Sequence, residues 1–228
     1  MILGKPKFEA KVDWQMIDTI LLDMDGTLLD KHFDDYFWEE YVPEVFAEKN
    51  KISVFDAEEE LLARYRKKEG SLDWTDLDFW SKELGLDIVA LKKKMNYLIK
   101  VHPYVVEFLE HYRENNKKIY LVTNAHSKTL AIKMKKTGLA NHFDRIICSE
   151  EVGMAKEDPE FWKKLEGMLN FSKDKTILAD DNEKVLDAAQ EFGFSRDQLI
   201  FVAKSSSTMP VIHSKNFPSI IFFKELMV

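Results

Sequence analysis

The sequence predicts an α/β protein, in which helices cover both faces of a parallel sheet and a smaller helical segment is inserted after the first strand. From His102 onward, short apolar runs that indicate strands alternate with helical patterns, and this alternation is typical of a parallel sheet. Between about residue 35 and residue 100, strand signals are absent and apolar residues recur at helical spacing. We therefore expect an α/β core formed by residues 1–31 and 101–228, and a helical insert formed by residues 32–100.

The predicted strands of the core are short and apolar. The first, at residues 19–23, lacks the polar alternation of a half-exposed strand, so we expect it to be covered on both faces. The later strands are expected, in chain order, at Lys118–Thr123, Arg145–Cys148, Thr176–Asp180 and Leu199–Val202, with a last apolar run at Ser219–Phe223.

Glycine and proline mark the ends of the predicted core helices. A helix is expected at Ser127–Thr137 and ends before Gly138, because glycine readily adopts the left-handed conformation that follows many helices. Pro159 lies near the start of another helix, where proline is tolerated, and Gly193 ends a third. The polar stretch Lys204–Pro218 is predicted to be a loop.

The helical insert is rich in aromatic residues. Leu77, Trp80 and Leu84 recur at helical spacing behind a capping pattern that begins at Thr75. Most of the aromatic side chains are expected to pack inside the insert, while one or two could stack on a nucleobase. The residues concerned are Phe37, Trp38, Phe79 and Trp80.

Composition and charge exclude several classes of protein. The net charge of −7 argues against a general binder of nucleic acid or of membrane surfaces, which needs a basic face. The single cysteine, Cys148, excludes an internal disulfide and a cysteine-rich zinc site and suits a reducing compartment. The sequence shows no secretory signal pattern and no membrane-spanning apolar run, so we expect a cytoplasmic protein. The charged runs Glu58–Glu60 and Lys92–Lys94 are expected to be solvated helix faces.

Reactive side chains follow four of the predicted strands. Because parallel strands direct their carboxyl ends to one edge of the sheet, where ligands bind, we expect these residues to lie together. In chain order they are Asp23 and Asp25, Thr123 and Asn124, Lys156, and Asp180 and Asp181.

Aspartates gathered at one edge repel one another unless a cation compensates their charge. Oxygen ligands of this kind select Mg²⁺, and Lys156 supplies a further positive charge that attracts a phosphate. One carboxylate can then accept a phosphoryl group, and a second can protonate the leaving oxygen and later activate water. Alternatively, Asp180 and Asp181 could cap a helix that begins near Glu183, and Lys156 taken alone could be a surface lysine.

The four motifs resemble those of the haloacid dehalogenase superfamily of phosphohydrolases. The first is Leu22-Asp23-Met24-Asp25-Gly26-Thr27-Leu28, and the Thr-Asn, Lys and Asp-Asp motifs follow it in the order typical of the superfamily. The resemblance implies a Rossmann-like core of three layers and a C1-type helical cap domain, which the insert would form. Lys156 is followed by Glu157, where a proline is frequent in the superfamily.

The resemblance also implies a role for each residue. Asp23 corresponds to the nucleophile and a metal ligand, and Asp25 to the general acid/base, with its backbone carbonyl on the metal. Thr123, Asn124 and Lys156 correspond to the phosphate-binding residues. Asp181 completes the site for Mg²⁺, and Asp180 assists from outside the direct ligand shell.

Over nearly its whole length the chain also resembles bacterial GMP/IMP nucleotidases of this superfamily. The matching segments include Phe33-Asp34-Asp35-Tyr36-Phe37-Trp38, Asp78-Phe79-Trp80 and Leu121-Val122-Thr123-Asn124-Ala125-His126. This resemblance implies a Mg²⁺-dependent phosphomonoesterase whose partner is a small phosphorylated metabolite, a purine 5′-nucleotide such as GMP or IMP. The alternatives are a sugar-phosphate phosphatase or a phosphomutase on the same scaffold, and a binding or regulatory protein without turnover.

Overall fold

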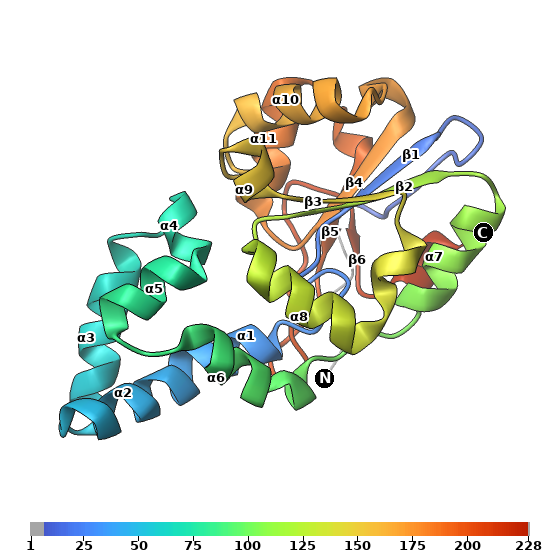
Figure 1. Cartoon of the computed structure of the whole chain (residues 1–228). Coiled ribbons are helices and arrows are strands. Elements are labelled where there is room, and N and C mark those ends of the chain that lie inside the picture. The colour runs from blue at the N-terminus through green and yellow to red at the C-terminus, as the bar shows by residue number, and fades with distance from the viewer. Residues whose placement is uncertain (1–6, 228) are drawn as a thin grey trace.

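A parallel sheet of six strands forms the centre of the larger part of the molecule (Figure 1). The structure is a computed structural model that describes residues 7–227. Residues 1–6, which begin the segment analysed for a secretory signal, lie outside the described residues. The strands lie in the order β3-β2-β1-β4-β5-β6, and each neighbouring pair is parallel. Their bounds are β1 Thr19–Leu22, β2 Lys118–Thr123, β3 Arg145–Cys148, β4 Thr176–Asp180, β5 Leu199–Val202 and β6 Ser219–Ile220.

Helices cover both faces of this sheet, which confirms the predicted α/β architecture (Figure 1). Within β1, Leu21 packs in the apolar cluster of one face, and its neighbours Ile20 and Leu22 pack in the cluster of the other. All three side chains are fully buried, which explains why the strand is continuously apolar. The helices of this part are α7 Val105–Glu114, α8 Ser127–Thr137, α9 Ser149–Val152, α10 Pro159–Leu169 and α11 Glu183–Phe192, with 3-10 turns at Leu139–His142, Lys173–Lys175, Arg196–Gln198 and Phe223–Leu226.

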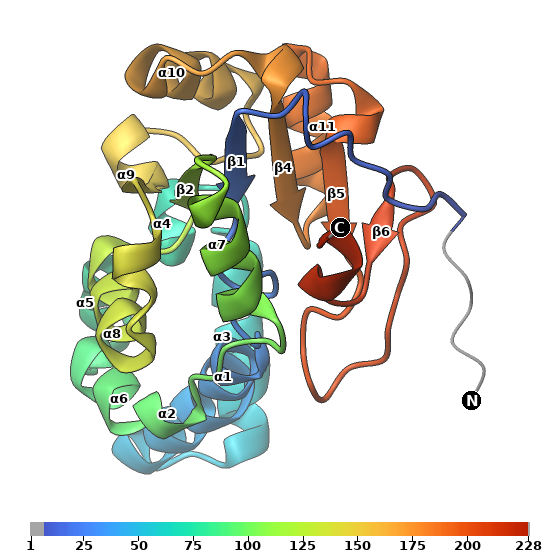
Figure 2. The same ribbon diagram turned by 90° about the vertical axis from the view of Figure 1, so that its right-hand side faces the viewer.

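The segment between β1 and α7 is helical, as its periodicity predicted. Figure 2 shows it on the side of the sheet toward which the strand arrows point. Its elements are α1 His32–Tyr36, a π-helical turn Phe37–Tyr41, α2 Val42–Asn50, α3 Val54–Arg66, α4 Leu72–Thr75, α5 Leu77–Leu84, α6 Ile88–Lys94 and a 3-10 turn Asn96–Leu98. We refer to residues 32–100 as the cap and to the rest as the core; this division remains a prediction.

Several local expectations can be compared with the structure. Gly138 follows α8 with a φ of 72°, and Pro159 begins α10, as predicted. The N-cap of α5 is Asp76 instead of Thr75, because its carboxylate accepts hydrogen bonds from the backbone N–H groups of the first turn. The last apolar run forms a strand only at residues 219–220 and then turns into a 3-10 helix.

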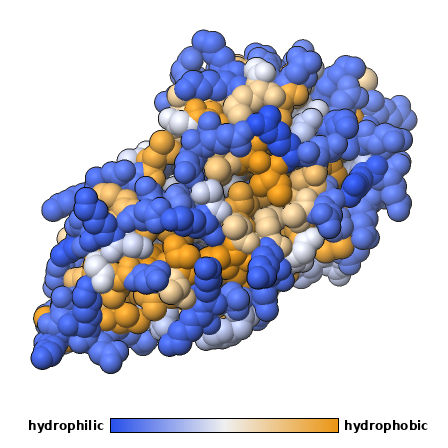
Figure 3. Space-filling view, in the orientation of Figure 1, coloured by the Kyte–Doolittle hydropathy of each residue, from blue (hydrophilic) through white to orange (hydrophobic). Residues whose placement is uncertain are grey.

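The surface is largely hydrophilic in the view of Figure 3, with apolar residues visible mainly over the lower part of the cap and the middle of the core. Glu58–Glu60 are exposed as expected. The expectation for Lys92 was wrong, since this side chain is buried while Lys93 and Lys94 are exposed. None of the helices within residues 7–227 is long and apolar enough to span a bilayer.

Candidate active site

The centre of the sheet brings the first and last predicted motifs together. Asp23 directly follows β1 and Asp180 ends β4, and these strands are neighbours. The backbone N–H of Asp23 donates to the carbonyl of Ala179 at 3.0 Å. The chain turns from one half of the sheet to the other at this pair of strands, and such a switch point is where open α/β sheets bind ligands.

Lys156 connects these two motifs through its ammonium group. Its Nζ lies 2.5 Å from Oδ1 of Asp23, 2.7 Å from Oδ2 of Asp180 and 3.2 Å from the carbonyl of Val122. The side chain is 2% exposed, so Lys156 is not the surface lysine of the alternative interpretation. Burial disfavours the charged ammonium, but the two carboxylates outweigh this effect and raise the pKa of Lys156.

The aspartates form a group that could hold a metal ion. Asp23, Asp180 and Asp181 each offer an oxygen, and these oxygens lie within 4.8 Å of one another. Burial raises the pKa of Asp23 and Asp180 to about 6, although Lys156 opposes the shift. Burial also raises the pKa of Asp181 to about 7, although Lys31 opposes it from 3.6 Å. The nearby lysines thus do not fully balance the negative charge of the three carboxylates, and a bound divalent cation would balance it.

The environment of Asp180 and Asp181 distinguishes their expected roles. Both oxygens of Asp180 already have partners, Nζ of Lys156 and the backbone N–H of Asn182, which suits a residue outside direct coordination. The Asp181 carboxylate lies directly against Gly26: a Cβ at this glycine would be 2.2 Å from Oδ2 of Asp181. Asp23 and Asp181 lie close enough to share an ion. That these two residues and the backbone carbonyl of Asp25 hold Mg²⁺, as the family resemblance implies, remains a prediction; the ion would supply positive charge to a bound phosphate.

The Thr-Asn motif ends β2, beside the same edge. The Thr123 hydroxyl accepts a hydrogen bond from the backbone N–H of Ala125. The Asn124 amide accepts from the backbone N–H of Lys156 at 3.0 Å and donates to Glu157 at 2.8 Å. In this structure Asn124 therefore holds the loop that carries Lys156, and its contact with phosphate remains a prediction.

Asp25 has a partner that sequence reasoning missed. Nζ of Lys133, from α8, lies 2.5 Å from Oδ1 of Asp25 and also contacts Oδ2 of Asp34. Burial raises the pKa of Asp25 to about 6 against the opposing charge of Lys133. Lys133 lies four residues after Thr129, on the same buried face of α8. The burial of that face is visible only in the structure, so the sequence offered no signal that set this lysine apart.

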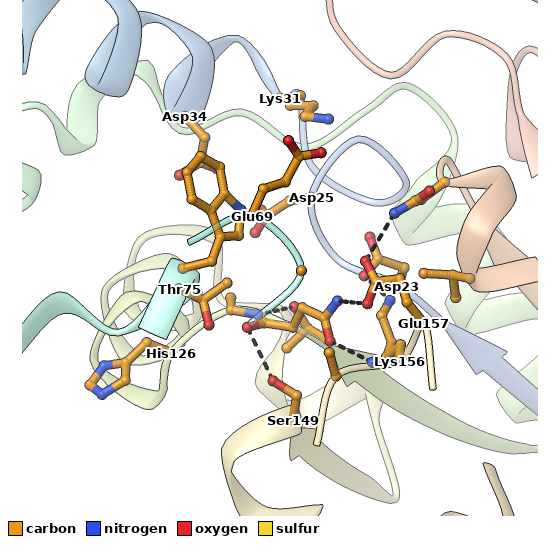
Figure 4. Close-up of a pocket in the computed structure, with 18 of the residues that line it drawn as sticks. Asp23, Asp25, Lys31, Asp34, Glu69, Thr75, His126, Ser149, Lys156 and Glu157 are labelled. Carbon is orange, nitrogen blue, oxygen red and sulfur yellow. Dashed lines mark hydrogen bonds and ion pairs between the residues drawn. The ribbon is translucent and has the colours of Figure 1, made fainter. Parts of the chain in front are cut away.

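A cavity of about 1150 Å³ connects this edge of the sheet with the cap. All seven predicted residues line it. Lys31, which precedes α1, and the cap residues Trp38, Tyr65 and Trp74 line it as well. Figure 4 shows Asp23 beside Lys156, with Asp25 on the side toward Asp34 and Glu69. The His126 ring points away from Asp23 and accepts a hydrogen bond from the Lys128 N–H.

Comparison with known proteins shows the family of the chain. The model of the haloacid dehalogenase-like hydrolases matches residues 17–193. The chain belongs to this hydrolase family. It is 40% identical, over 80% of its length and 82% of the relative's, to the GMP/IMP nucleotidase YrfG of Escherichia coli (strain K12). A phosphorylated carbohydrates phosphatase of Thermotoga maritima is 26% identical and covers 46% of the chain and 49% of its own length.

Solved structures of the haloacid dehalogenase-like hydrolases share the fold of this member. A phosphatase from Thermococcus onnurineus superposes with a TM-score of 0.78 at 23% identity, covering 92% of this chain and 96% of its own. An L-2-haloacid dehalogenase from Xanthobacter autotrophicus gives a TM-score of 0.61 at 18% identity, covering 92% and 96%. Because hydrolases with different substrates share the fold, the reaction has to be argued from the side chains.

Proposed function

We propose that this hydrolase is a Mg²⁺-dependent phosphomonoesterase that acts on purine 5′-nucleotides. The observation that carries the proposal is the grouping of Asp23, Lys156 and Asp181 at one strand edge, with a second carboxyl group, Asp25, two residues beyond Asp23. The Escherichia coli relative, whose name is GMP/IMP nucleotidase, supports the nucleotide as substrate.

Each of these residues would have a distinct role in the reaction. The Asp23 carboxylate attacks phosphorus and forms an aspartyl-phosphate, while the P–O bond to the nucleoside breaks. Asp25 donates a proton to the departing oxygen and then accepts one from the water that hydrolyses the intermediate. A pKa of about 6 suits Asp25 to both steps near neutral pH. The Lys156 ammonium balances the negative charge that gathers at Asp23 and the phosphoryl oxygens.

The cap would bind the base through its aromatic side chains. Trp38 and Trp74 line the cavity and flank Tyr65, edge to face, at ring distances of 5.7 and 5.8 Å. The Tyr65 hydroxyl is buried and has no hydrogen-bond partner among residues 7–227. An unpaired buried hydroxyl is unfavourable. When the surrounding indole rings separate on binding, a purine with an acceptor at position 6 would pair with this hydroxyl while stacking on one of them.

A phosphate-release screen tests the function. GMP, IMP, AMP, pyrimidine nucleotides and sugar phosphates are compared at equal concentration with Mg²⁺ and with a chelator. We expect the highest kcat/KM for GMP or IMP and no release with chelator. A preference for sugar phosphates, to which the Thermotoga maritima relative's name points, would overturn the substrate, and no release from any monoester would overturn the function.

Replacing Tyr65 by Phe is expected to raise KM for GMP about five- to tenfold with little change in kcat, since one hydrogen bond contributes about 1 kcal/mol. Hydrolysis of p-nitrophenyl phosphate, which has no base to bind, is expected to stay constant. Steady-state kinetics on both substrates measure the effect. Tyr97→Phe is the control, because Tyr97 is 60% exposed. Unchanged KM for GMP in Tyr65→Phe would contradict this base-binding arrangement.

A further inference from the structure

Two lysines beside the site are almost completely buried. Lys92 lies on α6 of the cap and Lys133 on α8 of the core, and each is 1% exposed. Both contact the carboxylate of Asp34 on α1: Lys92 Nζ lies 2.7 Å from Oδ1, and Lys133 contacts Oδ2. Lys133 also contacts Asp25. Charges of alternating sign therefore run from Asp25 through Lys133 and Asp34 to Lys92.

Stability alone does not account for this arrangement. Removing an ammonium or carboxylate group from water costs several kcal/mol, and well-packed apolar residues often replace buried ion pairs without loss of stability. Lys92 packs over the rings of Phe33 and Phe37, at 4.8 and 4.5 Å from their centroids. An apolar side chain would suit those rings. The charged set is therefore better explained by what it does to Asp25.

The contacts of Asp25 indicate that the charged set orients its carboxyl group. Within the part of the chain that the structure describes, the hydrogen bond of its carboxyl group runs from Lys133 to Oδ1. Oδ2 is thus left to exchange a proton with the substrate, and the side chain is 24% exposed toward the cavity. A group that transfers a proton has to lie within hydrogen-bond reach of the reacting oxygen, so the orientation that Lys133 imposes bears directly on rate.

We propose that Lys133 is a positioning residue, which Asp34 and Lys92 hold in place and which orients Asp25 for proton transfer. Because Asp34 and Lys92 belong to the cap and Lys133 to the core, the same contacts link the orientation of Asp25 to the seating of the cap on the core. This inference rests on the proposed function, in which Asp25 protonates the departing oxygen.

The test compares leaving groups that differ in their need for a proton. Nucleoside alkoxide departs with a proton from Asp25, whereas p-nitrophenolate departs without one. For Lys133→Met we expect kcat/KM to fall about 100-fold for GMP, the order of a general acid's contribution, and less than about threefold for p-nitrophenyl phosphate. Asp25→Asn serves as the reference and should show the same contrast. Lys92→Met, one step further away, should show a smaller effect in the same direction.

Lys128→Met is the matched control. Lys128 also lies on α8 and also reaches the cap, through an ion pair with Asp78 at 2.5 Å, but it does not contact Asp25. We expect it to leave both substrates unchanged. Equal losses of kcat/KM for both substrates in Lys133→Met would show a merely structural role and overturn the inference.

A conservative variant covers the case in which Lys133→Met does not fold. Lys133→Arg keeps the positive charge opposite Asp34 but changes the geometry at Asp25. A loss of kcat/KM confined to the nucleotide supports positioning, and equal losses of kcat/KM for the nucleotide and p-nitrophenyl phosphate overturn it. If wild-type protein hydrolyses another alkyl phosphate but no nucleotide, the comparison uses that ester and only the proposed substrate fails. Release from no monoester would overturn the proposed function and this inference together.

Discussion

Replacing Asp23 by Asn is expected to reduce phosphate release by about 10⁴-fold or more, the order of loss when a covalent nucleophile is removed. An amide is too weak a nucleophile to attack phosphorus, and it contributes less to binding a cation. Lys156 keeps its contacts with Asp180 and Val122 in the variant, so the fold should persist. Steady-state phosphate release and thermal unfolding measure the two effects.

The control for Asp23→Asn is Asp187→Asn. Asp187 is an exposed residue of α11, so the same chemical change there should affect neither rate nor melting temperature. Unlike Lys133→Met, Asp23→Asn should impair GMP and p-nitrophenyl phosphate equally, since both reactions need the nucleophile. Activity within tenfold of wild type in the folded variant would exclude Asp23 as the nucleophile.

Replacing Gly26 by Ala is expected to abolish Mg²⁺-dependent activity and to lower stability. The glycine has a φ of 84°, and the added Cβ would lie 2.2 Å from Oδ2 of Asp181. Either this carboxylate or the turn after β1 must move, and both belong to the proposed metal site. The left-handed conformation alone costs an alanine about 1–2 kcal/mol. Activity assays and thermal unfolding with and without Mg²⁺ measure the change.

Gly138→Ala separates the cost of the left-handed backbone conformation from the collision of the added Cβ with Asp181. Gly138 has a φ of 72°, but no atom lies within 4 Å of an added Cβ, so this variant has the backbone strain without the collision. It should lose about 1–2 kcal/mol of stability and keep its activity and its stabilisation by Mg²⁺. If Gly26→Ala also kept its activity and its stabilisation by Mg²⁺, Asp181 would not hold the ion in the way proposed.

The fold was predictable because its signals are local. Continuous apolar runs such as residues 19–22 indicate strands that are covered on both faces, and Leu21 and its neighbours do face opposite apolar clusters. Helix ends at Gly138 and Pro159 depend on the conformations of single residues. The N-cap of α5 was misplaced by one residue, because Thr75 and Asp76 are both able to cap and only the backbone geometry selects between them.

Sequence alone determined which reactive residues follow which strands, because a parallel sheet brings the carboxyl ends of its strands to one edge. Only the tertiary structure decided the partners of those residues. Lys133 and Asp25 are 108 positions apart, and helical spacing does not distinguish a buried lysine that meets a distant carboxylate from a solvated one. Lys92, expected on a solvated face, is buried for this reason. Periodicity describes one element at a time, whereas a buried charge is stable only where the packing of several elements supplies its counter-charge.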